Sequence, residues 1–317
     1  MILLAGIPSE APMALVIDAL DAIGAAYRVF DQRRVQECGI AVASAGNEEG
    51  GALHGRLTLA GESIALEEIS AAYLRLMDDR LLPDIVAAGA ASIEGAHSRR
   101  LHEDLLWWAD VAPGRIVNRP ADMGSNQSKP YQAHRIRAAG FAVPDTLITN
   151  DPAAARAFIE EAWAEKSDTI YKSISGVRSV VERVTPDDLA RLDRIRWCPV
   201  QFQRHVRGVD VRVHTIGARV FAAAIESGAT DYRYAMRQVG EAARIAAMEL
   251  EPAIAARCIE LAGDLRLPLA GIDLRRQDDG SFVCFEVNPS PAFSFYEERT
   301  GLPIALAIAR YLAGEDG

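Results

Sequence analysis

"CFEVNPSPAFSFYE", residues 284–297, is the stretch that decides how this chain can fold and act. A run of apolar residues that begins at Phe282 ends in Glu286 and Asn288, and a proline-rich loop follows. Side chains two apart on a strand point to the same face, so this carboxylate and this amide lie together. Buried polar side chains are costly unless something pairs with them. We therefore expect Glu286 and Asn288 to hold a ligand.

The preceding segment supplies a third polar side chain. Residues 268–275 and 281–288 predict two strands joined by a short polar turn, which is an antiparallel hairpin. Asp273 then shares the face of Glu286, diagonally across the hairpin. Two carboxylates and an amide oxygen suit a hard cation such as Mg²⁺, which with few protein ligands generally brings phosphates with it. The sequence thus predicts that Asp273, Glu286 and Asn288 hold a nucleotide's magnesium; the alternative is an edge hairpin with solvated acids.

Lysine is rare in this chain. Among 34 basic residues only three are lysines, namely Lys129, Lys166 and Lys172. A chain that otherwise uses arginine can keep lysine where a compact ammonium is needed. Lys172 lies on a predicted strand before a Ser/Gly loop, and Lys129 begins a predicted helix, where the helix dipole favours anions. No Walker A motif is present, so these two lysines are the candidates for holding phosphates; biased codon usage and solvated lysines are the alternative.

Two further predicted strands carry candidate site residues. Arg212 alternates with Asp210 on one of them and could neutralise a transferred phosphate. The other, "VQFQR" at residues 200–204, could pair its backbone with the edge of an adenine ring. A solvated surface arginine is the alternative for Arg212.

Composition bounds the class of protein. The 317 residues suffice for two or three domains, with 50% hydrophobic and 25% charged residues. A net charge of −10 argues against nucleic acid as a partner. The four cysteines are far apart, without zinc spacing or a disulfide framework, so we expect a cytoplasmic protein. The apolar N-terminus is short and predicts a first strand rather than a signal peptide, and no apolar run is long enough for a membrane span.

The order of elements predicts an α/β fold. The chain opens as strand–helix–strand without a GxGxxG motif, and an α/β domain ends near residue 115. A connector, a helix that ends at Gly140 and a set of strands and helices follow. The remaining elements that we predict are a hairpin at 53–66, a helical stretch at 83–109, a hairpin at 209–227, a long helix at 241–264 and a terminal helix at 302–313.

In combination these residues resemble the ATP-grasp superfamily and, within it, the RimK-type ligases. The resemblance covers residues 115–317 and rests on Lys129, "YKSISG", "QFQ", "GVDVRVHTIGARVFAA", "GIDL" and "FEVNPSP" in this order. It implies a pre-ATP-grasp domain at 1–115, a central lid subdomain at 116–204 and a metal and nucleotide subdomain at 205–317. The resemblance also implies site residues: Lys129 and Lys172 on the ATP phosphates, Gln201, Phe202 and Gln203 at the adenine hinge, Asp210 among the nucleotide-binding residues, Arg212 on the acyl phosphate, and Asp273, Glu286 and Asn288 on Mg²⁺.

A narrower resemblance covers "KPYQAHRIRAAGFAVPDTLITNDP", residues 129–152, and "DYR", residues 231–233. These are similar to the microviridin-type graspetide synthetases, which join acidic side chains of a precursor peptide to hydroxyls or amines. The resemblance implies a homodimeric, ADP-forming carboxylate ligase that uses ATP and Mg²⁺ on a peptide or a small carboxylate. Arg178 and Arg233 are then candidates for holding the substrate carboxylate. The alternatives are an amino-acid ligase of the glutathione-synthetase kind, an ATP-grasp kinase and a nucleotide-binding regulatory protein.

Overall fold

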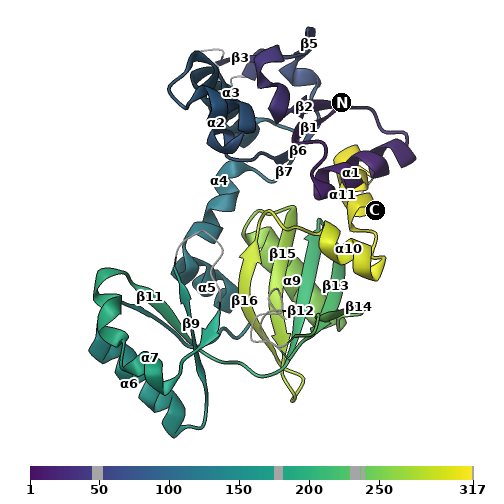
Figure 1. Cartoon of the computed structure of the whole chain (residues 1–317). Helices are drawn as coiled ribbons and strands as arrows, with labels where there is room; N and C mark the ends of the chain where they lie inside the picture. Colours follow the sequence, from purple (N-terminus) through teal and green to yellow (C-terminus); the bar gives the residue numbers. More distant parts are fainter. Residues whose placement is uncertain (45–52, 175–180, 229–235, 237–239, 316–317) are drawn as a thin grey trace.

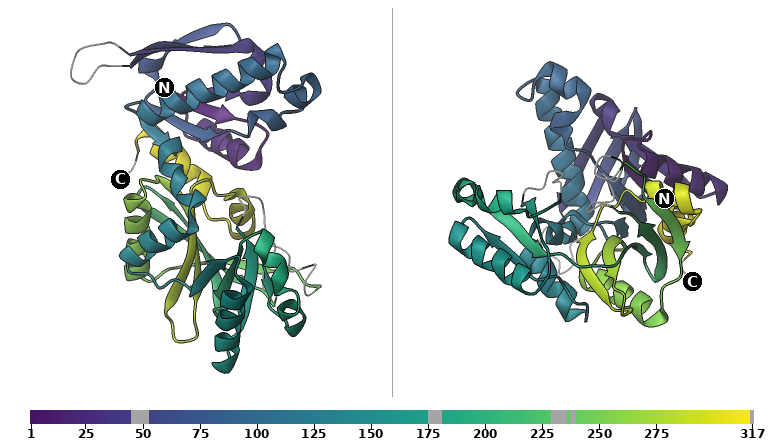
Figure 2. Two further views of the ribbon diagram at one scale, coloured as in Figure 1. Left: turned by 90° about the vertical axis from the view of Figure 1, so that its left-hand side faces the viewer. Right: turned by 60° about the horizontal axis from the view of Figure 1, so that its bottom comes forward.

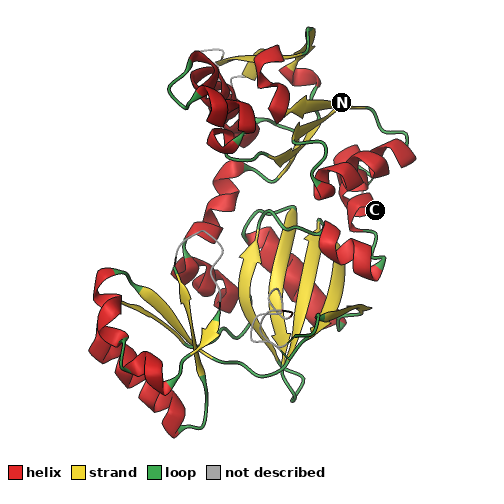
Figure 3. Cartoon of the chain, viewed as in Figure 1, coloured by secondary structure: helices red, strands yellow, loops and turns green. Residues whose placement is uncertain are grey.

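The chain forms four β-sheets with helices packed against them, which confirms the predicted α/β class (Figures 1 and 3). The computed structural model describes residues 1–44, 53–174, 181–228, 236 and 240–315, and all structural statements concern these residues. We distinguish an N-terminal lobe (residues 1–117 with the last helix), a middle lobe (residues 146–204) and a C-terminal lobe built on residues 209–288. In both views of Figure 2 the middle and C-terminal lobes lie beside each other.

The N-terminal lobe is built on a parallel sheet in the order β2-β1-β6-β7. Alternate residues of its first strand serve two cores: Leu4 packs with the first and last helices on one face, and Leu3 packs with the long helix α3 on the other. A small antiparallel sheet, β3-β4-β5, covers the second core. The elements are β1 (Ile2–Gly6), α1 (Ala11–Ala22), β2 (Tyr27–Asp31), β3 (Cys38–Ser44), β4 (Leu53–Leu59), β5 (Glu62–Ala65), β6 (Ala71–Arg75), α2 (Pro83–Ala88), α3 (Ile93–Val111), β7 (Arg115–Val117) and α11 (Ile304–Ala313).

The predicted helical stretch at 83–109 is two helices. Gly89 ends α2 with a φ of 91°, a conformation that glycine adopts without a steric penalty. The predicted hairpin at 53–66 is confirmed as β4 and β5, and β3 adds a strand that we had not predicted.

The middle lobe is an antiparallel sheet in the order β10-β9-β11-β8 with helices on one face. Phe202, Ile159 and Leu192 belong to the apolar cluster between this sheet and its helices. The elements are β8 (Thr146–Thr149), α6 (Pro152–Ala164), β9 (Thr169–Ser173), β10 (Glu182–Arg183), α7 (Pro186–Leu189) and β11 (Val200–Arg204).

The C-terminal lobe is a five-stranded antiparallel sheet in the order β14-β13-β12-β15-β16. Helix α9 covers one face, where apolar side chains of the strands and of α9 form one buried cluster. The elements are β12 (Val209–Ile216), β13 (Arg219–Glu226), β14 (Arg244–Met248), α9 (Pro252–Asp264), β15 (Leu269–Arg276), β16 (Phe282–Asn288) and α10 (Ser294–Thr300).

One predicted helix was wrong in part. The Ala-rich segment 241–264 contains the edge strand β14 and then α9, which begins at Pro252. Pairing of residues 244–248 with β13 outweighs their helical propensity. The predicted terminal helix at 302–313 is confirmed as α11, and α10 precedes it.

Two segments pack outside the ranges suggested by the sequence. Helix α5 (Lys129–Ala138) lies in the range assigned to the lid, yet its Ile136 is buried in the core of the C-terminal sheet. Helix α11 ends the chain but packs with α1 of the N-terminal lobe in a shared apolar core. The same core also contains Ile216 of β12 and Leu269 of β15, so the N- and C-terminal lobes are joined through it. Of the helices in the described ranges, none combines the length and apolar character needed to cross a membrane.

Candidate active site

The face of the C-terminal sheet opposite α9 carries a row of charged side chains. Along β12, Val211 and Val213 point into the core against α9, so Arg212 lies on the opposite face. Arg212 pairs in register with Asp273 of β15, which pairs in register with Glu286 of β16. The Nη1 of Arg212 donates a 2.6 Å hydrogen bond to Oδ1 of Asp273. Three neighbouring strands therefore contribute one charged group each to a single row.

The metal residues predicted from the hairpin lie together. The hairpin is confirmed, but Asp273 lies directly opposite Glu286 rather than diagonally, because the register shifts after Asp273 and Phe285 becomes the extra residue of a bulge. Asn288 lies one step further along the same face, opposite Gly271. Its Oδ1 accepts a 2.9 Å hydrogen bond from the backbone N–H of Ser290. The amide oxygen keeps a second lone pair for a ligand.

Lys129 reaches this row from α5. Its Nζ lies 2.7 Å from Oε2 of Glu286 and 3.3 Å from Oδ1 of Asn126. The helix is fixed to the strand by Gln132, which was not predicted as a site residue: its amide nitrogen donates to the carbonyl of Val287 at 2.8 Å, and its Oε1 accepts from the N–H of Val287 at 3.0 Å. These two hydrogen bonds to the backbone of Val287 hold α5 against β16 and so set the position of Lys129 beside Glu286.

The electrostatics of Glu286 reflect these neighbours. Burial by itself would raise the pKa of the Glu286 carboxyl, but the charge and hydrogen bond of Lys129, and then the charges of Lys172 and Arg212, outweigh burial and lower that pKa. Glu286 is thus held as a carboxylate. The influence of Lys172, which lies on β9 of the middle lobe, shows that the two lobes bring their cations toward the same carboxylate.

The donor set fits a hard divalent cation. Asp273, Glu286 and Asn288 present two carboxylates and one amide oxygen on one face, the ligand chemistry that Mg²⁺ prefers. In the part of the chain that the structure describes, no group of three or more His, Cys, Asp or Glu side chains is placed to hold a metal. A cation here would therefore need ligands from outside the protein, such as phosphate oxygens.

The residues predicted for the adenine hinge divide between the faces of the middle sheet. Gln201 pairs in register with Lys172 and shares its face. The side chain of Phe202 points to the other face, where it is buried in the apolar core of the lobe. We predicted that Phe202 lines the adenine hinge, and we correct this prediction because its side chain is not available to a ligand on the face of Lys172. Gln203 donates a 2.9 Å hydrogen bond to the hydroxyl of Thr146.

The backbone prediction for residues 200–204 also needs correction. Strand β11 is paired with β8 on one side and with β9 on the other. Its backbone groups over residues 200–203 are used in these ladders, so an adenine ring cannot pair with them. Any backbone contact with a base would have to come from the residues after the strand.

Asp210 has a partner of its own. Its Oδ1 accepts hydrogen bonds from Nε and Nη2 of Arg275, at 2.8 and 2.6 Å. Arg275 also donates to the carbonyl of Val206, so the pair ties the connection between β11 and β12 to β15. Arg178 and Arg233, the two candidates for the substrate carboxylate, lie outside the described residues.

Two residues that support Arg212 were not predicted. Gly271 lies beside the guanidinium, and an added Cβ would come within 2.7 Å of its Cζ. A glycine inside a strand is the sequence signal for such a close approach. His214, fully buried, lies with Nε2 3.5 Å from Nε of Arg212; burial and then the charge of Arg212 lower its pKa, so His214 is neutral.

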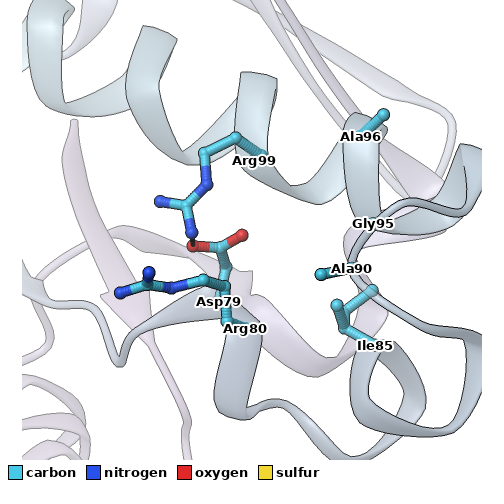
Figure 4. Close-up of a pocket in the computed structure, with 7 residues that line it drawn as sticks. All are labelled: Asp79, Arg80, Ile85, Ala90, Gly95, Ala96 and Arg99. Atoms are coloured by element: carbon cyan, nitrogen blue, oxygen red, sulfur yellow. Dashed lines mark ion pairs between the residues drawn. The ribbon is translucent and has the colours of Figure 1, made fainter.

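A cavity of about 320 Å³ lies elsewhere, in the N-terminal lobe (Figure 4). It is lined by residues of α2, α3 and the turn before them, and the 2.7 Å ion pair between Arg99 and Asp79 spans one side of it. There Asp79 pairs with Arg99 and Arg80 with Asp78, whereas the row on the C-terminal sheet offers a metal-type oxygen set. We therefore take the row as the candidate active site.

Comparison with known proteins bears on this site. Residues 129–312 match the RimK-like ATP-grasp domain family. The ATP-grasp ligase PsnB, solved with a minimal precursor, Mg and ADP, is 29% identical, with 99% of this chain and 96% of that chain covered and a TM-score of 0.76. The macrocyclase MdnC from Microcystis aeruginosa MRC, solved with the precursor peptide MdnA, shares the fold with a TM-score of 0.80 at 24% identity over 100% of both chains.

A similarity to curated proteins is also present. Beta-citrylglutamate synthase B from Homo sapiens is 26% identical over 207 residues, which are 63% of this chain and 53% of that protein. The chain thus spans about half the length of the beta-citrylglutamate synthases that it matches.

Proposed function

Because this chain belongs to the RimK-like ATP-grasp family, we propose that it is an ATP-dependent ligase that activates a carboxylate as an acyl phosphate and joins it to an amine or hydroxyl. The observation that carries the proposal is the row Arg212, Asp273, Glu286, with Lys129 at its end. ATP transfers its γ-phosphoryl group to the carboxylate and leaves as ADP. The amine or hydroxyl then attacks the acyl carbon, loses its proton and displaces inorganic phosphate, which carries away one carboxylate oxygen. The joined product therefore weighs one water less than its two parts.

The residues of the row have separate tasks in this proposal. Asp273, Glu286 and Asn288 would hold Mg²⁺, which when bound supplies positive charge to the phosphates. Lys129 and Lys172 bind phosphate oxygens from two sides, one from α5 and one from β9. Arg212, which is buried and oriented by Asp273, would offset the charge that builds up on the transferred group. Positioning and charge compensation then account for most of the rate, without a nucleophilic side chain.

The substrate we propose is a peptide with acidic side chains. Support comes from PsnB, which was solved with the precursor peptide PsnA2 and whose structure covers 99% of this chain. The second candidate is a small carboxylate with an amino acid, which the similarity to beta-citrylglutamate synthase and to probable alpha-L-glutamate ligases favours. A homodimer and a cytoplasmic location stay predictions, which light scattering and cell fractionation can test.

One experiment separates the two substrate classes. The purified protein is incubated with ATP and Mg²⁺ and either with acidic peptides encoded beside its gene or with glutamate and citrate. We expect ADP release to depend on a peptide and the peptide to lose the mass of one water per bond formed. Efficient ligation of free amino acids, with no response to any peptide, would support the second candidate. A phosphorylated product that is never ligated would identify a kinase instead.

A further inference from the structure

We propose that Arg75 of the N-terminal lobe is a positioning residue for the metal site, because it holds the loop that follows Asn288. This inference rests on the proposed function, since it concerns the same magnesium ligands. The inference gives the N-terminal lobe a role in orienting a metal ligand, whereas the family resemblance implied site residues only from Lys129 onward.

The contacts of Arg75 run in two directions. Its Nη1 donates to Oγ of Ser290 at 3.3 Å and to the carbonyl of Pro291 at 3.2 Å. On the other side, Nη2 and Nε donate to the two carboxylate oxygens of Glu10 at 2.6 and 3.2 Å. A bidentate pair of this kind fixes the plane of the guanidinium. Only 9% of the Arg75 side chain is exposed, so it has little freedom to adopt another position.

The sheet topology explains why these residues meet. Arg75 is the last residue of β6, and Glu10 follows β1, its parallel neighbour. The chain goes from β1 to β2 on one side and from β6 to β7 on the other, so the strand order reverses between β1 and β6. The carboxyl ends of strands at such a reversal are where open α/β sheets place ligands. Here that position is taken by the loop from the C-terminal lobe, and the end of β16 faces the N-terminal lobe in Figure 1.

A second anchor holds the start of the same loop. Asn118, buried in the segment after β7, donates to the carbonyl of Pro289 at 2.6 Å and to that of Leu269 at 2.6 Å. Leu269 in turn donates to Oδ1 of Asn118 at 3.1 Å. The loop is therefore fixed at three successive residues by groups outside the C-terminal sheet.

The link to the metal ligand is short. The backbone N–H of Ser290 donates to Oδ1 of Asn288, the atom that would bind the cation. Moving Ser290 therefore moves or frees the side chain of Asn288. Partners behind a metal ligand orient it, and their loss typically lowers metal affinity by about 10- to 100-fold.

A purely structural role is the competing explanation. The two lobes already share an apolar core, which includes Leu4 of β1 and Leu269 of β15, so they need no polar bridge to stay docked. Burying an arginine costs free energy even when it is paired. The need to hold the amide oxygen of Asn288 in place accounts for burying the ion pair between Arg75 and Glu10. Docking of the two lobes does not account for it.

The test measures metal binding separately from turnover. Calorimetry gives the affinity for Mg·ADP and for ADP without metal, in wild type, Arg75→Ala and Ser290→Ala. The matched control is Arg33→Ala, because Arg33 lies just after β2 at the same edge of the sheet but contacts Asp31 and Ser9 instead of the loop. We expect Arg75→Ala to weaken Mg·ADP binding by about tenfold or more, with ADP alone unchanged and kcat largely restored at high Mg²⁺.

Ser290→Ala removes one exposed hydroxyl that accepts from Arg75, so this variant should fold and lose about two- to threefold in Mg·ADP affinity. Arg33→Ala should match wild type. Unchanged Mg·ADP affinity in Arg75→Ala would overturn this inference but leave the proposed function standing. If Arg75→Ala does not fold, unchanged affinity in both Ser290→Ala and Glu10→Gln would have the same meaning. A wild-type protein that binds no Mg·ADP would overturn the proposed function as well.

Discussion

Replacing Gly271 with alanine tests the position of Arg212 with one methyl group. Gly271 lies on β15 between the guanidinium of Arg212 and the ring of Pro291. A Cβ at this position would lie 2.7 Å from Cζ of Arg212, nearer still to Nη2, and 2.8 Å from Cβ of Pro291. Ordinary contacts between such atoms are about 3.5–4.0 Å. Both the guanidinium and the loop must therefore move away from the added methyl group, by about 1 Å.

The cost can be estimated from what surrounds Arg212. Its side chain is buried, and its Nη1 is bound to Asp273 at 2.6 Å, so a shift of 1 Å breaks or strains that bond. Overpacking of this kind costs about 1–3 kcal/mol of stability. A catalytic group misplaced by about 1 Å can cost roughly 100-fold in rate. We therefore expect Gly271→Ala to stay folded and to lose about two orders of magnitude in kcat for ADP formation.

The assay is coupled detection of ADP at saturating ATP, Mg²⁺ and substrate, with thermal unfolding measured alongside. Gly263→Ala is the matched control, since Gly263 lies in α9 with nothing within 4 Å of an added Cβ. This control should keep wild-type turnover and gain about 0.5–1 kcal/mol of stability, because alanine replaces glycine inside a helix. Wild-type turnover in a folded Gly271→Ala variant would refute the role of Arg212 and the proposed arrangement of the row.

Three further predictions concern other residues of the chain. Glu286→Gln keeps the shape but removes a charged ligand, so ATP turnover should fall by more than about 100-fold while the fold stays intact; wild-type ADP formation would contradict the metal assignment. Lys172→Arg should weaken nucleotide binding by about tenfold or more, whereas Lys166→Arg should have no effect, and equal affinities by calorimetry would remove the argument from rare lysines. Burial, followed by nearby arginines, lowers the pKa of His205 from 6.5 to about 4. The unfolded state therefore binds a proton at His205 more readily than the folded state does. The contribution of neutral His205 to the free energy of unfolding is complete above about pH 6.5 and is lost as the pH falls toward about 4. His205→Asn should therefore reduce the difference in Tm between about pH 7.5 and about pH 5.

The hairpin that carries the metal residues could be predicted because its signals are local. Alternation of period two and a polar turn fixed which residues share a face, and β15 and β16 confirm it. The bulge at Phe285 could not be predicted, since a register shift depends on how both strands pack against their neighbours. The prediction of a diagonal Asp273 was wrong for this reason.

Non-local packing explains the other differences. Residues 244–248 read as helix because alanine favours helices, but they complete an open sheet edge beside β13. Phe202 was assigned to the nucleotide by its place in a motif, while its side chain fills the core of the middle lobe. Arg75 bears on a loop that lies more than 200 residues away in sequence, so no window of sequence could have linked it to the site.

The charge balance of the row explains why a second lysine-bearing element, β9 with Lys172, is needed. Arg212 with Asp273 and Lys129 with Glu286 make two ion pairs, so these four groups are neutral together. A magnesium nucleotide carries net negative charge, and a neutral row cannot compensate it. Lys129 moves with the carboxylates, because Gln132 fixes α5 to β16, whereas Lys172 belongs to the middle lobe, whose sheet is separate. We therefore expect the extra positive charge to come from across the site, where Lys172 is one of the charges that lower the pKa of Glu286.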